Sequence, residues 1–134
     1  DIARKLQARV IQLVAWPNRK LSDFENKQGP KEFVTLFKHA EYVVTTSFHG
    51  TAFSIIFNKN FNVVRLNNGR DGRAANLLKS VGLSDRIVGL ADDVVPTEID
   101  YSSPNKLLSD LRNKSETLLN RALYDKSKYN NTRL

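Results

Sequence analysis

The chain has 134 residues, of which 40% are hydrophobic and 26% are charged, a composition typical of one compact globular domain and not of a mainly disordered chain. It contains no cysteine, which excludes a disulfide scaffold, a cysteine zinc site and a thiol nucleophile. The net charge of +7 comes from the two ends, since residues 1–40 and 104–134 each contribute +4 and residues 41–103 contribute −1.

Hydrophobic patterning predicts strands and helices that alternate along the chain. In chain order we expect a strand at 10–16, a helix at 30–39, a strand at 42–46, a buried helix at 50–57, a strand at 61–66, a turn at 67–73, a short helix at 74–81 closed by Gly82, a strand at 86–88, and a long helix that begins at Ser103-Pro104. This order predicts an α/β fold with a Rossmann-like parallel sheet and helices on both faces. We expect one domain over residues 1–124 and a frayed tail over 125–134.

The sequence also bears on where the protein works. No stretch approaches the roughly 18 apolar residues of a membrane span, and the first residues do not resemble a signal peptide. With the absence of cysteine, this predicts a cytoplasmic protein. The chain begins at Asp1 without an initiator methionine, which indicates a fragment of something longer.

The strongest site candidate is the segment 45–51, TTSFHGT, which joins a predicted strand to a predicted helix. Open α/β sheets bind ligands at such joins, and the free amides of a helix start favour an anion. Gly50 allows the backbone to approach a ligand, Ser47 and Thr51 offer hydroxyl groups, and His49 can transfer a proton. A purely structural interpretation stays open, with Ser47 as a helix cap and Gly50 serving tight packing.

Arginines follow this join, and they include Arg70, Arg73 and Arg86. Guanidinium groups bind phosphate and carboxylate with two parallel hydrogen bonds, so they suit a small anion better than a nucleic acid, although an ordinary solvated surface is the alternative. The acids of residues 92–100 have no histidine partner, and we therefore expect no metal site there.

The segment GPKEFVTLFKHAEYVVTTSFHGTAFSIIFNKNF, residues 29–61, resembles the C-terminal part of polysaccharide pyruvyl transferases, with their SFHGT-x-FS motif and the apolar helix after it. The arginine at 73 and the VGLSDR segment at 81–86 are similar to later segments of that family. Two positions depart from its pattern: Thr46 stands where the family usually has Asp, and Asn60 where it has Pro.

The resemblance implies transfer of pyruvate from phosphoenolpyruvate to a saccharide or lipid-linked saccharide acceptor, as a ketal, with no further cofactor. It implies the C-terminal, donor-binding half of a GT-B-like two-domain enzyme, with the N-terminal domain missing from this chain. His49 and Arg73 would be catalytic. The donor would be held by Ser47, Phe48, Gly50, Thr51, Arg70 and Arg86. The protein would lie at the inner face of the membrane, with peripheral contact only.

Two other functions remain open from the sequence. The chain could be the donor-binding domain of a nucleotide-sugar glycosyltransferase, for which Glu98 is the one weak candidate to hold a ribose. It could also be a non-catalytic module that binds an anionic polymer through its basic ends.

Overall fold

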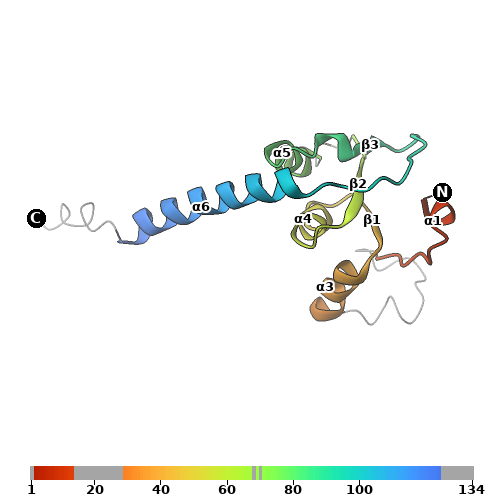
Figure 1. Ribbon diagram of the computed structural model, residues 1–134, viewed down its shortest axis with the longest axis horizontal. Helices are drawn as coiled ribbons and strands as arrows, with labels where there is room; N and C mark the ends of the chain where they lie inside the picture. The colour runs from red at the N-terminus through yellow and green to blue at the C-terminus, as the bar shows by residue number, and fades with distance from the viewer. Residues whose placement is uncertain (1, 14–28, 68, 70, 125–134) are drawn as a thin grey trace, which may run out of the picture.

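A computed structural model of the chain describes residues 2–13, 29–67, 69 and 71–124. Its centre is a parallel sheet of three strands in the order β1-β2-β3 (Figure 1). The strands are β1 (Tyr42–Thr45), β2 (Asn60–Arg65) and β3 (Ile87–Gly89). Val43 pairs with Phe61 and Val63 pairs with Ile87, so all three strands end at the same edge of the sheet. The predicted α/β class with a parallel sheet is confirmed.

The helices connect these strands in turn. They are α1 (Ile2–Lys5), α3 (Pro30–His39), α4 (Phe48–Ile56), α5 (Gly72–Ser80) and α6 (Ser102–Tyr124), with a short 3-10 turn η1 (Ser84–Arg86) before β3. Pro30 begins α3 at a position where its missing amide N–H costs nothing. Gly82, with φ of +74°, ends the α5 region in the left-handed conformation that favours glycine.

One face of the sheet carries the core. Alternate strand residues Val43, Phe61 and Val63 are buried there, because side chains two apart in a strand point to the same side. Helices α3, α4 and α5 cover this face (Figure 1). Phe33, Phe37 and Phe53 lie with ring centroids 4.9 to 5.8 Å apart and join α3 to α4.

Within the described residues the other face has less cover, and the prediction of helices on both faces is met there by one short helix. Of the described elements, only the four-residue helix α1 lies on this side (Figure 1), and its Ile2 lines a small hollow together with Val44, Val64 and Val88. Lys5 fixes α1 there by an ion pair with Asp93 at 2.8 Å. The asymmetry follows from strand order, because consecutive crossovers in one direction place their helices on one face.

Element boundaries otherwise follow the sequence closely, with two exceptions among the described residues. The helix after β1 begins at Phe48 and not at residue 50, so the histidine of the join belongs to its first turn. The predicted strand at 10–16 is wrong over residues 10–13, which form no strand and are exposed. Residues 14–16 lie outside the described part of the chain, as does the predicted tail at 125–134. A continuous apolar segment becomes a buried strand only when it finds a partner strand.

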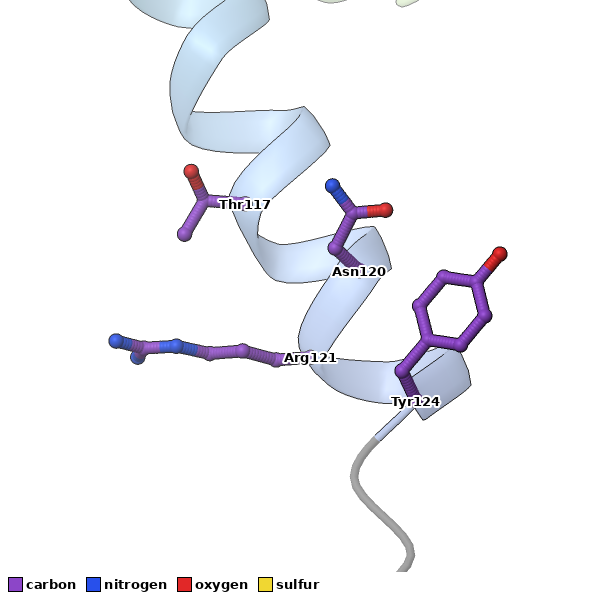
Figure 2. A pocket seen from close by; sticks show the side chains of 4 residues that line it. All are labelled: Thr117, Asn120, Arg121 and Tyr124. Carbon is purple, nitrogen blue, oxygen red and sulfur yellow. The ribbon is translucent and has the colours of Figure 1, made fainter.

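Helix α6 leaves the body of the molecule as a long arm (Figure 1). Pro104 is buried at its start, and Leu108 and Leu111 pack against the core. Residues 112–124 are all exposed. The hollow at the end of the arm is lined by Thr117, Asn120, Arg121 and Tyr124, all from this one helix, so it is open to solvent (Figure 2).

Candidate active site

The join between β1 and α4 is organised around Ser47. Its hydroxyl accepts a hydrogen bond from the amide of Gly50 at 2.9 Å, which makes Ser47 the N-cap of α4. Its carbonyl accepts from both the amide and the hydroxyl of Thr51, at 3.0 and 2.9 Å. Among the described residues, none accepts a hydrogen bond from the amides of Phe48 and His49. The start of α4 therefore presents two free N–H groups and the positive end of the helix dipole.

Gly50 is required by the closeness of β1 to α4. A Cβ atom placed there would overlap Oγ1 of Thr45 and lie 2.9 Å from Cβ of Thr45, closer than real Cβ atoms come to other atoms, and it would make a tight contact of 3.1 Å with Oγ of Ser47. Thr45 in turn accepts a hydrogen bond from the Ser47 amide at 3.1 Å. Thr45 is the first residue of the candidate segment 45–51, although the sequence assigned it no role of its own.

His49 and Arg73 meet at this helix start through Phe48. The rings of Phe48 and His49 lie edge to face, with centroids 5.9 Å apart. The guanidinium of Arg73, from the first turn of α5, lies 5.5 Å from the centroid of the Phe48 ring, within range of a cation–π interaction. Phe48 is half-buried, whereas His49 and Arg73 are exposed. The structure thus brings together three residues that the sequence had placed in the site, two of them 24 positions apart.

Asp71 holds the loop that leads to Arg73. Its carboxylate accepts hydrogen bonds from the amides of Asn67 and Leu66, at 2.8 and 3.4 Å, and so closes the turn between β2 and α5. Its carbonyl accepts the first bond of α5 from the Ala75 amide. Sequence reasoning missed this residue, because its bonds run back to amides four and five positions earlier and no local turn pattern indicates them.

The other predicted site residues do not join the group formed by Phe48, His49 and Arg73. Thr51 is fully buried, and a contact between its hydroxyl and a ligand would require it to release the Ser47 carbonyl. Arg70 lies outside the described residues. Arg86 points away from the join, since its guanidinium donates to the Thr97 hydroxyl at 2.8 Å and pairs with Asp85 at 3.0 Å.

Arg86 belongs to a polar network at the amino end of the sheet. The buried Asn62 side chain accepts from the Tyr42 hydroxyl and donates to the Arg86 carbonyl at 3.3 Å. The Tyr101 hydroxyl donates to the Lys59 carbonyl at 2.6 Å. Burial raises the pKa of both tyrosine hydroxyls, and the nearby Arg86 charge partly opposes that shift. The network pairs most of its polar groups within the protein, which is typical of a structural role; the buried Nε of Arg86 is the exception, since it lies in an ion pair with Asp85 but forms no hydrogen bond among the described residues.

Comparison with known protein families now identifies the chain. The family described as polysaccharide pyruvyl transferase matches residues 1–68, about half of the sequence. The chain belongs to the polysaccharide pyruvyl transferase family. Comparison with curated proteins and with solved structures gives no significant match.

The family match covers the β1–α4 join and stops before α5. Ser47, Phe48, His49, Gly50 and Thr51 therefore lie inside the matched region, whereas Arg73 and Arg86 lie beyond it. The expected resemblance is confirmed over the join, and it extends toward the N-terminus beyond the motif at residue 29. The site role of Arg73 rests on its contact with Phe48.

Two further features concern ligands and membranes. Within the described ranges, histidines and carboxylates form no group of three that could hold a metal ion. Among the described helices none is long and apolar enough to cross a bilayer.

Proposed function

We propose that the start of α4 binds phosphoenolpyruvate and that the protein transfers its pyruvyl unit to a saccharide of a cell-surface polysaccharide precursor. The observation that carries this proposal is the meeting of His49, Phe48 and Arg73 at a helix start with two free amides. Membership of the pyruvyl transferase family supports the reaction class.

The donor is a small anion with a phosphate and a carboxylate. A helix N-terminus favours either group through its amides and dipole, and a guanidinium binds either with two hydrogen bonds. We assign the free amides of Phe48 and His49 to one anionic group and Arg73 to the other. Phe48 holds the Arg73 side chain in place without using its N–H donors, because a cation–π contact engages the face of the guanidinium.

His49 is the proposed proton donor. Protonation of the methylene carbon of phosphoenolpyruvate places a positive charge on the carbon that carries the phosphate, and a sugar hydroxyl then adds to that carbon and loses its proton. The C–O bond to phosphate breaks and inorganic phosphate leaves, and a second hydroxyl adds to give the ketal. Of the two hydroxyl protons lost, one returns to His49 and the other leaves with the phosphate. Arg73 stabilises the charge on the departing phosphate. His49 is exposed at the edge of the site and can exchange protons with solvent between turnovers.

The same proposal extends to the role of this domain in the whole enzyme, its acceptor and its location. We infer that this domain forms the donor-binding half of a GT-B-like enzyme whose acceptor is a saccharide or lipid-linked saccharide. We further infer that the enzyme uses no cofactor and works in the cytoplasm at the inner face of the membrane.

Calorimetry tests the donor assignment directly. Phosphoenolpyruvate should bind the chain, and Arg73→Ala should weaken binding about tenfold or more, since a charge-assisted bond contributes about 1.5–3 kcal/mol. A nucleotide sugar titrated in parallel should not compete. Stronger binding of the nucleotide sugar than of phosphoenolpyruvate would contradict the proposal and favour a glycosyltransferase.

The role of His49 needs a separate test. His49→Gln should leave phosphoenolpyruvate affinity within about threefold, because the backbone amide that binds the anion remains. It should abolish phosphate release in the presence of an acceptor saccharide, measured by a coupled phosphate assay. Full turnover by His49→Gln would remove the proton-donor role while leaving the binding site standing.

A further inference from the structure

The exposed half of α6 carries a surface that the pyruvyl transfer site does not use. From Leu111, its last residue against the core, to Tyr124 the helix extends about 20 Å without cover from the described body. Leu118, Leu119 and Leu123 are 66%, 60% and 70% exposed. With Ala122 they form one apolar face, because residues three and four apart are neighbours on a helix.

Basic residues border one side of this face, and Glu116 lies on its other side, one turn before Leu119. Lys114 lies one turn before Leu118 and Arg121 one turn after it, and Arg112 lies two turns before Leu119. The opposite side of the helix carries Asn120 and Tyr124, which Figure 2 shows pointing away from Arg121. The whole segment 104–134 contributes +4 to the net charge. An apolar strip with a basic border is the pattern of helices that lie at an anionic lipid surface.

We propose that the outer half of α6 binds the surface of a bilayer that contains anionic phospholipid. The leucines enter the boundary between headgroups and acyl chains, and Lys114, Arg121 and Arg112 contact the phosphates around them. The last turns extend beyond the body (Figure 1), so they reach a planar surface without burying the sheet or the α4 start. This inference does not depend on the identity of the donor.

A second copy of the chain fits the same face less well. Residues 112–124 carry three basic side chains and one acidic side chain, so two such helices packed along their leucines would bring two segments of net positive charge together. Like charges at the edges of a helix pair oppose association. The charge pattern therefore selects an anionic partner.

Vesicle co-sedimentation tests the proposal on the intact chain. We expect the protein to sediment with vesicles of phosphatidylglycerol and phosphatidylcholine but not with phosphatidylcholine alone, and to be released by high salt. The double variant Leu119→Gln, Leu123→Gln should weaken partitioning about tenfold or more, because two exposed leucines lose their burial in lipid. Glutamine keeps a good helix propensity, and circular dichroism checks that α6 persists.

Two matched variants sharpen the result. Thr117→Gln with Asn120→Gln changes the opposite side of the same turns and should bind within about twofold of the parent chain. Lys114→Gln with Arg121→Gln should lose about fivefold per charge on anionic vesicles. Failure of the parent chain to bind anionic vesicles would overturn the proposal, as would equal binding by all three variants. Concentration-dependent dimers abolished by Leu119→Gln, Leu123→Gln, with no vesicle binding, would assign the face to a second copy instead.

Discussion

The two ends of the parallel sheet use polar residues in opposite ways. At the carboxyl end, the Ser47–Gly50 turn leaves two amides free and exposes His49 and Arg73. At the amino end, Arg86, Tyr101 and Asn62 bond to protein groups and leave little for a ligand. A basic or aromatic residue near a parallel sheet therefore points to ligand binding only at the end where helices begin.

The largest expected effect comes from closing the space at Gly50. Gly50→Ala should lower the free energy of unfolding by about 1–3 kcal/mol and abolish phosphoenolpyruvate binding, because the new methyl group pushes α4 away from Thr45. Chemical denaturation and calorimetry measure the two effects.

Gly72→Ala is the matched control. A Cβ at Gly72 would meet nothing within 4 Å, so this variant should be neutral or gain up to about 1 kcal/mol. If Gly50→Ala were as stable as Gly72→Ala, the tight β1–α4 contact would not be the reason for glycine at position 50.

Replacing each arginine by methionine in turn distinguishes a binding role at the carboxyl end of the sheet from a structural role at the amino end. Arg73→Met should weaken phosphoenolpyruvate binding about tenfold with little change in melting temperature, since Arg73 is exposed. Arg86→Met should leave the affinity within about twofold but lower the stability by about 1–2 kcal/mol, because Thr97 and Asp85 lose their partner. The reverse pattern would place the donor at the amino end.

Loss of the N-cap of α4 should have a smaller effect on stability than the Gly50→Ala and Arg86→Met changes above. Ser47→Ala should cost about 1 kcal/mol of stability, because the Gly50 amide loses its acceptor. Ser47→Asp restores an acceptor and should recover the stability, yet its negative charge should weaken phosphoenolpyruvate binding. Recovery of both properties by Ser47→Asp would argue that no anion binds at this helix start.

The smallest effect is a loss of stability at alkaline pH. The pKa of Tyr101 is raised by burial, so the folded state favours the neutral hydroxyl. Its contribution is fully present below pH 10, the ordinary tyrosine value, and declines as the pH rises above it, because the unfolded chain then loses the proton first. Urea titrations at pH 9 and pH 11 should show this decline, and Tyr101→Phe should reduce it. An identical decline in Tyr101→Phe would exclude Tyr101 as its source.

Local sequence predicted the β1–α4 join well because its contacts are local. The Ser47 cap, the close approach of Gly50 to Thr45 and the Thr51 backbone bond all join residues within five positions of one another. The contact of Arg73 with Phe48 joins two helices across β2, and no periodicity encodes it. The sequence placed Arg86 in the site together with Arg73 because both are arginines that follow the join. Sequence alone does not show at which end of the sheet each side chain lies.

The cover of the two faces of the sheet was also not predictable from local sequence. Alternation of strands and helices predicts a parallel sheet, but the number of covered faces depends on strand order. The residues at 10–13 are apolar enough for a strand and yet pair with none of the described strands. Hydrophobic pattern thus predicted most elements, while pairing decided which apolar segment entered the sheet.

The most direct test of the account is a nitrogen-15 NMR titration of the chain with phosphoenolpyruvate. The account predicts that the amide signals of Phe48, His49 and Gly50 shift together with the side-chain signal of Arg73, while those of Arg86 and Thr97 stay in place. Shifts confined to Arg86 and Thr97, or none at saturating donor, would contradict the assignment of the donor site to the start of α4.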